Sequence, residues 1–192
     1  MRKLIVCNII SVDGFFSGPN GDVMVMPFDA PFSEYNAERL RAADTLLLGR
    51  RSFEGFRDYW PSVADDPDQP PVEREISRLN NAIDKVVVSD TLAEADLAPW
   101  TTSRIVSRAD AHDAIRELKR ADGREILVFG SHVLWNDLLT AGLVDEMHLM
   151  IGSAFLGSGV PVFDGPRTGL RLLDARVMDD SQLVLARYEA TG

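Results

Sequence analysis

The feature that most constrains the fold is a junction between an apolar run, 125–129, and a helical pattern over 132–141. Two small residues, Gly130 and Ser131, separate these patterns. A strand that turns through such a pair into a helix leaves the first N–H groups of that helix unpaired, at the positive end of its dipole. Such a helix start favours a bound phosphate. The junction therefore predicts an α/β fold with an anion site at a strand end.

A second junction of this kind lies upstream, at Leu-Leu-Leu-Gly-Arg-Arg-Ser-Phe-Glu, 46–54. Gly49 lets a ligand approach the backbone, and Ser52 is expected to cap a helix over 52–59. Arg50 and Arg51 offer forked donors that match phosphate. A solvated turn with two surface arginines remains the alternative at this point.

Strand and helix patterns alternate along the chain, which predicts a three-layer α/β/α fold with a mostly parallel central sheet. Residues 1–192 are expected to form a single domain. An antiparallel hairpin, 170–178 and 182–188 with a turn at 179–181, is expected to close the sheet. The other predicted strands are 3–12, 45–48, 85–89, 104–106, 125–129 and 146–151, and the predicted helices are 34–43 (capped by Ser33), 52–59, 72–82, 110–121 and 132–141.

Composition limits the partners and the compartment. The net charge of −10 argues against a nucleic-acid or anionic-membrane surface. No stretch approaches the roughly 20 apolar residues that span a bilayer. A lone cysteine, Cys7, cannot form an internal disulfide and is expected in the core, which suits a cytoplasmic protein. The three histidines, His112, His132 and His148, share no ligand spacing, so no metal site is predicted.

Four segments, in this order, resemble the dihydrofolate reductase superfamily, and the similarity covers nearly the whole chain. The closest branch is that of the reductase (C-terminal) domain of the riboflavin-biosynthesis bifunctional deaminase–reductase, which 154–163 also resembles. The segments are Ser-Val-Asp-Gly at 11–14, Leu-Leu-Gly-Arg-Arg-Ser-Phe-Glu at 47–54, Lys-Val-Val-Val-Ser-Asp-Thr-Leu at 85–92 and Ile-Leu-Val-Phe-Gly-Ser at 126–131.

This resemblance implies a dihydrofolate reductase-like fold and an NADPH-dependent reductase of a pteridine- or pyrimidine-type heterocycle. The hydride transfer would be of the type catalysed by 5-amino-6-(5-phosphoribosylamino)uracil reductase or by dihydrofolate reductase. Proteins of this family often form homodimers, so a homodimer is expected by analogy.

The same resemblance assigns cofactor residues along the chain. Many family members have a cis peptide at the glycine pair that corresponds to Gly130–Ser131, and the sequence leaves that point open. The phosphates would be held by Gly49, Arg50, Arg51 and Ser52; the adenosine end would lie beside Ser89 and Asp90; the pyrophosphate and nicotinamide would be lined by Gly130, Ser131, His132, Val133 and Leu134.

Departures from the family pattern keep two alternatives open. Asp90 stands where relatives often carry arginine, and a carboxylate repels a 2′-phosphate but can accept from a free ribose hydroxyl. NADH is therefore a possible cofactor, and an NAD-dependent dehydrogenase is one alternative. Phe129 replaces the acidic residue that precedes the glycine pair in riboflavin reductases. The missing substrate acids leave a non-catalytic NADP(H)-binding sensor or sequestering protein as the other alternative.

Hydride transfer needs the acceptor held against the nicotinamide and one proton source. The candidate proton donors are Asp13, Asp29 and Glu34, of which Asp13 follows the first strand and Glu34 begins a predicted helix. Packing or turn roles are the alternatives for all of these residues. Candidate aromatic rings for stacking on a flat substrate are Phe28, Phe32 and Phe155.

Overall fold

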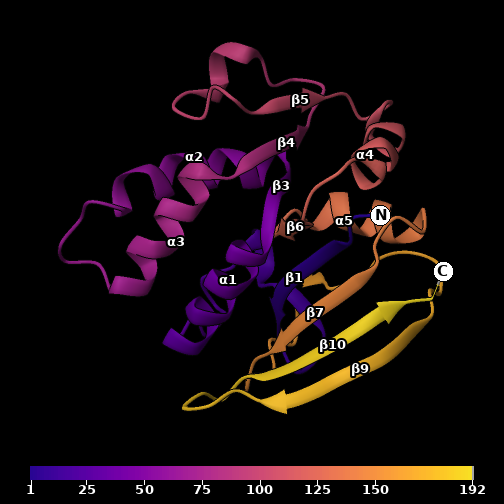
Figure 1. Cartoon of the computed structure of the whole chain (residues 1–192). Coiled ribbons are helices and arrows are strands. Elements are labelled where there is room, and N and C mark those ends of the chain that lie inside the picture. The colour runs from indigo at the N-terminus through magenta and orange to yellow at the C-terminus, as the bar shows by residue number, and fades with distance from the viewer. Residues whose placement is uncertain (192) are drawn as a thin grey trace.

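The computed structural model describes residues 1–191 and builds them around one eight-stranded sheet, ordered β5-β4-β3-β6-β1-β7-β10-β9 (Figure 1). Neighbouring strands from β5 to β7 are parallel, and β10 and β9 continue the sheet as an antiparallel hairpin. The predicted mostly parallel sheet with its closing hairpin is confirmed. The strands are β1 (Leu4–Ile10), β3 (Ala43–Gly49), β4 (Asp84–Val88), β5 (Arg104–Val106), β6 (Glu125–Phe129), β7 (Glu146–Ile151), β9 (Leu170–Val177) and β10 (Val184–Ala190).

Helices cover both faces of the parallel part, which gives the three predicted layers (Figure 1). On one face α1, α2 and α3 pack over alternate residues of β1, among them Ile5 and Cys7. On the other face α4 and α5 pack over Leu4 and Val6. Every residue of β1 is buried, as expected for a strand covered on both sides. The helices are α1 (Ala30–Ala42), α2 (Arg50–Val63), α3 (Pro71–Ala82), α4 (Ala111–Arg120) and α5 (His132–Thr140).

Two helices begin earlier than predicted, for local reasons. The side chain of Asp29 accepts from the Phe32 N–H at 3.0 Å and caps α1, so the helix starts four residues before the predicted start. Ser33 instead bonds to Glu73 of α3. Helix α2 starts immediately after Gly49, which places Ser52 inside the helix rather than at its cap. That position frees the Ser52 hydroxyl for a contact with the neighbouring strand end.

Two very short strands were not predicted. Strand β2 (Phe15–Ser17) pairs with β8 (Val160–Pro161) and ties the loop after β1 to the glycine-rich loop after β7. A Cβ on Gly159 would lie 2.0 Å from the Ser17 carbonyl oxygen, so only glycine fits this approach. Neither Phe15-Phe16-Ser17 nor Val160-Pro161 shows a run of alternating apolar and polar residues, and Pro161 has no N–H for a strand ladder.

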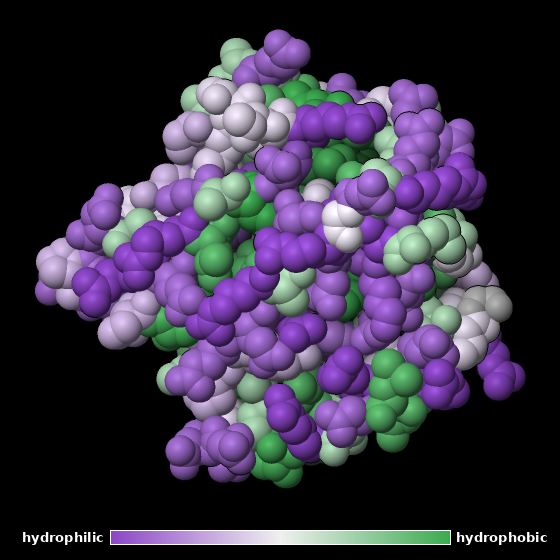
Figure 2. Space-filling model, in the orientation of Figure 1, coloured by the Kyte–Doolittle hydropathy of each residue, from purple (hydrophilic) through white to green (hydrophobic). Residues whose placement is uncertain are grey.

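The C-terminal hairpin is the least covered part of the sheet. All eight residues of the edge strand β9 are exposed, Leu172 and Val177 among them. In Figure 2, apolar side chains interrupt the hydrophilic lower margin of the molecule, where Figure 1 places β9. Over residues 1–191, none of the helices has the length and apolar character that a membrane crossing requires.

Candidate functional site

The two predicted phosphate turns lie side by side, because β3 and β6 are neighbouring parallel strands. The Gly49 N–H donates to the Ser131 hydroxyl at 3.1 Å, and the Ser131 N–H donates to the Ser52 hydroxyl at 2.8 Å. The turn after each strand is thus fastened to the turn after the other. The segments 49–52 and 130–132 therefore form one continuous site at the carboxyl ends of β3 and β6.

Helices α2 and α5 start at these turns without side-chain caps. Neither Gly49 nor Ser131, the residues at the two N-caps, makes a side-chain cap hydrogen bond. The first N–H groups of a helix have no partner within that helix. Two sets of donors and two positive dipole ends therefore meet at one edge of the sheet, which suits a diphosphate. The donors belong to Arg50, Arg51, Ser52, His132, Val133 and Leu134.

The turn after β6 depends on glycine at position 130. Gly130 has φ +56°, and a Cβ there would lie 3.1 Å from the Ser52 hydroxyl oxygen. The cis peptide common in the family is not found at Gly130–Ser131; over residues 1–191 the cis bond is Ala98–Pro99. Here two successive left-handed residues, Gly130 and Ser131 (φ +49°), reverse the chain instead.

Asn8, in the middle of β1, is a functional candidate that the sequence analysis did not assign. Its side-chain oxygen accepts from the Gly130 N–H at 2.8 Å, so it locks the turn from the neighbouring strand. The sequence feature that could have identified Asn8 is a polar residue within an apolar strand. Its partner, Gly130, is close only because β1 and β6 are neighbouring strands.

The arginines of the first turn are solvent-accessible. Arg50 forms an exposed i,i+4 ion pair with Glu54 at 3.0 Å, and Arg51 is also exposed. An exposed pair of this kind contributes little to stability, so a phosphate can draw Arg50 away from Glu54 at small cost.

The adenosine end, as assigned from the family, contains one more cation than predicted. Ser89, at the end of β4, accepts from the N–H groups of Thr91 and Leu92 and shapes the turn. Asp90 accepts from the Arg108 N–H at 2.8 Å and lies 3.6 Å from its guanidinium. Arg108 follows β5, and only the pairing of β4 with β5 brings it to Asp90.

His132 has a structural contact that was not foreseen. Its Nε2 lies 2.7 Å from the Pro161 carbonyl oxygen, and its ring packs against Phe16 with centroids 5.0 Å apart. The side chain therefore holds β8 against the start of α5, and the backbone N–H of His132 is what it offers to a phosphate.

The three candidate proton donors are engaged elsewhere. Asp13 accepts from the Ser11 hydroxyl and from the N–H groups of Leu156 and Gly157. These hydrogen bonds, of which the one from Ser11 contributes most, lower the pKa of Asp13 to about 2, so the carboxylate is ionised at neutral pH and fixes the loop. Asp29 caps α1 and accepts from the Ser181 hydroxyl at 2.5 Å. Glu34 faces the outer groove between α1 and α3.

The predicted aromatic residues fall at the mouth of the same sheet edge. Phe28 packs on Phe32 with ring centroids 4.9 Å apart, and Phe32 in turn packs on the core. Phe155 is 77% exposed and belongs to the loop that Asp13 fastens. Two of the three rings are thus available to a substrate near the ends of β1 and β7.

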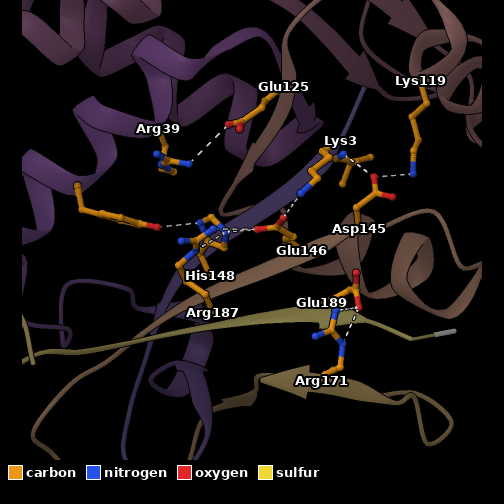
Figure 3. A network of polar contacts seen from close by, with 12 residues as sticks. Lys3, Arg39, Lys119, Glu125, Asp145, Glu146, His148, Arg171, Arg187 and Glu189 are labelled. Carbon is orange, nitrogen blue, oxygen red and sulfur yellow. Dashed lines mark hydrogen bonds and ion pairs between the residues drawn. The ribbon is translucent and has the colours of Figure 1, made fainter. Parts of the chain in front are cut away.

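A buried ionic network lies between α1 and the strands β7 and β10, in the first half of β7 and away from its carboxyl end (Figure 3). His148 is fully buried, and its Nδ1 lies 2.9 Å from the Tyr35 hydroxyl while its Nε2 lies 3.0 Å from the Glu146 carboxylate. Because the carboxylate accepts, Nε2 carries the proton and Nδ1 accepts from Tyr35. Lys3 and Arg187 also reach Glu146, at 2.5 and 3.3 Å.

The pKa values of this network follow from burial and its hydrogen bonds. Burial raises the pKa of Glu146, but the hydrogen bonds from His148, Lys3 and Arg187 outweigh it and bring the value to about 2. Burial lowers the pKa of His148 and outweighs the opposing pull of Glu146, so the ring is neutral at pH 7. The network supports the sheet and reaches none of the phosphate turns.

Comparison with known proteins gives consistent matches. The model of the RibD C-terminal domain family matches residues 2–185. The uncharacterized protein YyaP of Bacillus subtilis is 31% identical over 195 residues, covering 100% of this chain and 96% of YyaP.

Two solved structures share the fold. Acinetobacter baumannii RibD superposes with a TM-score of 0.72 at 16% identity, covering 100% of this chain and 58% of that one. Dihydrofolate reductase from Enterococcus faecalis, complexed with NADP(H), superposes with a TM-score of 0.59 at 15% identity, covering 99% and 97%. These likenesses establish a dihydrofolate reductase-like fold.

Proposed function

The chain belongs to the RibD C-terminal domain family, and from this premise we propose that it is an NADPH-dependent reductase of a pteridine- or pyrimidine-type heterocycle. One observation carries the proposal: the uncapped starts of α2 and α5 lie side by side, fastened through Ser52 and Ser131. The N–H groups of 50–52 and 132–134 would hold the pyrophosphate. When bound, the cofactor supplies hydride from C4 of its nicotinamide.

Strand order gives the direction of the cofactor along the sheet edge. Ser89 and Asp90 end β4, the two turns end β3 and β6, and β1 follows. An adenosine beside β4 therefore directs the nicotinamide towards β1, where Asn8 and the mouth with Phe28 and Phe155 lie. The acceptor would bind beyond β6, at the ends of β1 and β7.

Solvent water is the proton source that best fits the mouth. Asp13 is ionised and fully engaged, and Asp29 and Glu34 have other contacts. The exposed Phe155 indicates that water reaches the mouth, so the chain has to position the acceptor and need not carry the proton itself.

NADPH rather than NADH is favoured by the surroundings of Asp90. Its carboxylate is already paired with Arg108, whose guanidinium offsets the repulsion that Asp90 alone would exert on a 2′-phosphate. Arg50 and Arg51 add exposed positive charge nearby. The NAD-dependent alternative rests on the negative charge of Asp90, and the contact with Arg108 weakens that argument.

We also propose that the chain is a cytoplasmic homodimer that pairs through β9. An edge strand presents unpaired backbone groups, and the exposed leucines of β9 add apolar area for a second copy. Light scattering coupled to size exclusion should give twice the chain mass, and Leu172→Lys should halve it. A monomeric wild-type chain at micromolar concentration would refute the pairing.

Cofactor binding is tested directly by titrating the full-length chain with NADPH and NADH in a calorimeter. The variant Val133→Asp places a carboxylate in the first turn of α5, where it stabilises the helix but repels a phosphate. We expect an unchanged or raised melting temperature with at least tenfold weaker NADPH binding. Pro71→Asp, at the start of α3, is the matched control and should bind normally.

Absence of binding to either nucleotide at millimolar concentration would refute the proposed function. Binding without oxidation of NADPH across folates, pterins and ribosylaminopyrimidines would instead favour the alternative, a sensor or sequestering protein. Turnover of any one of these compounds would exclude that alternative.

A further inference from the structure

Two loops beside the carboxyl ends of β1 and β7 form a surface that the proposed function does not explain, and the inference drawn from it rests on that function. This surface, called the acceptor wall below, consists of residues 11–29 and 152–157. Its two segments are joined where the Val12 N–H donates to the Ala154 carbonyl and where Asp13 accepts from Leu156. A Cβ on Gly152 would lie 3.2 Å from the Pro27 ring, so the loops pack closely.

The acceptor wall contains no lysine or arginine. None occurs between Lys3 and Arg39, or between Arg124 and Arg167, and these stretches include the whole wall together with β1, β6, α5 and β7. The wall does contain three carboxylates, those of Asp13, Asp22 and Asp29. The hydrogen bonds to Asp13 keep it ionised. An anionic substrate group would meet net negative charge here.

Cations on neighbouring elements are committed elsewhere. Arg187 is bound to Glu146 on β7, and Arg78 donates to the Ala64 carbonyl at the end of α2. Arg74 lies one turn before Arg78 on α3, a helix that packs against α1 and α2. Arg176 belongs to the exposed edge strand β9, separated from β7 by β10. No side chain of this set turns the wall into a phosphate site.

The helix start at the wall is also closed to anions. Helix α1 is capped by Asp29, which takes the Phe32 N–H, and Pro31 in its first turn has no N–H to offer. The Ser11 hydroxyl is bonded to Asp13. Donors that hold phosphates at α2 and α5 thus have no counterpart at α1.

The wall exposes apolar side chains. Met24 is 75% exposed and Phe155 is 77% exposed, and neither packs against the hydrophobic core. Flat, neutral rings are the ligands that such side chains contact favourably. The remaining exposed apolar residues of the wall are Val12, Val23, Val25 and Phe28.

From this arrangement we propose that the acceptor is an uncharged, unphosphorylated flat heterocycle that packs against Phe155. The phosphate of a 5-amino-6-(5-phosphoribosylamino)uracil-type substrate would meet three carboxylates here, and the wall has no lysine or arginine to neutralise it. The substrate class is therefore the heterocycle or its nucleoside, not its phosphate ester.

The test compares matched ligands on the NADPH-saturated chain. Calorimetry first establishes that NADPH is bound, so that failure of the proposed function is seen separately. Pterin, lumazine and the ribosylaminopyrimidine with and without its 5-phosphate are then titrated. We expect the dephosphorylated member to bind at least tenfold more tightly than its phosphate ester. Tighter or equal binding of the ester, or no binding of any neutral member, would overturn the proposal.

Two substitutions at one exposed position sharpen the test. Phe155→Ala should weaken the neutral ligand about tenfold by removing the stacking surface. Phe155→Lys should narrow or reverse the preference by adding the missing cation. Ala82→Lys, exposed at the far end of α3, adds the same charge at the opposite edge of the sheet and should change neither affinity. An unchanged preference in Phe155→Lys would also contradict the assignment.

Discussion

The helix starts near the proposed cofactor and the helix start near the proposed acceptor differ in whether a side chain caps them. Helices α2 and α5 begin without a side-chain cap, and their free N–H groups converge between β3 and β6. Helix α1 begins on a carboxylate cap, Asp29, with a proline in its first turn. The extended backbone at Asp29 resembles that at Gly49, so between α1 and α2 the residue at the cap decides whether the helix start can accept an anion.

The two ends of the cleft also rest on different kinds of support. The cofactor end is held by three hydrogen bonds, in which the N–H groups of Gly130, Ser131 and Gly49 donate to the side chains of Asn8, Ser52 and Ser131 in that order. On the acceptor side, strand β7 is held by the buried network of Glu146 and His148, which lies at the start of the strand and not at its carboxyl end. Damage to the first should therefore appear mainly in cofactor binding, and damage to the second mainly in stability.

Loss of the buried carboxylate should have the largest effect. Glu146→Gln leaves Lys3, Arg187 and His148 without their common acceptor charge, and we expect a loss of about 3 kcal/mol in the free energy of unfolding. Urea denaturation measures it. The control is Glu189→Gln, which breaks an exposed pair with Arg171 on the same sheet and should cost less than about 1 kcal/mol. Equal losses in both variants would show that the buried network stabilises the fold no more than an exposed ion pair does.

The same network predicts sensitivity to acid. The pKa of His148 is lowered from 6.5, so its contribution is present above pH 6.5 and is lost as the pH falls below that value. The pKa of Glu146 is lowered from 4.5 to about 2, so its contribution is lost between these two values. Unfolding free energy measured from pH 7 to pH 3 should fall in both windows. In Glu146→Gln the fall in the lower window should be smaller than in the wild-type chain, although Asp13, Asp44 and Glu75 still titrate there from lowered pKa values. An unchanged fall would contradict the assignment.

Crowding of the phosphate turn should reduce cofactor binding more than stability. Gly130→Ala adds a Cβ 3.1 Å from the Ser52 hydroxyl at a positive φ, and we expect about 2 kcal/mol of destabilisation with clearly weaker NADPH binding. Gly142→Ala has the same backbone strain (φ +66°) but an open Cβ position, so it should lose about 1 kcal/mol and bind NADPH normally. Normal NADPH binding by Gly130→Ala would show that this turn does not contact the cofactor.

Removal of the arginines should separate the two nicotinamide cofactors. The double variant Arg50→Ala, Arg51→Ala should weaken NADPH about tenfold more than NADH, because only NADPH carries the 2′-phosphate. Arg108→Ala is expected to act in the same direction. Equal losses for the two nucleotides would show that these side chains do not read the 2′-phosphate.

The smallest effect on chemistry is expected at Asp13. Asp13→Asn should loosen the loop at 154–157, seen as faster hydrogen exchange there, while the pH dependence of kcat stays unchanged. Glu34→Gln should change neither. A shifted pH profile in Asp13→Asn would restore Asp13 as the proton donor.

The sequence by itself determined the layers of the fold and the two phosphate turns, because the period of apolar residues and the position of glycines act locally. It also determined that the acceptor wall has no cation, since that follows from where lysine and arginine are absent. The tertiary structure alone decided the roles of Asn8 and Arg108. Each of these acts on a residue that strand order or chain folding brings close, and a linear pattern contains no information on which strands become neighbours.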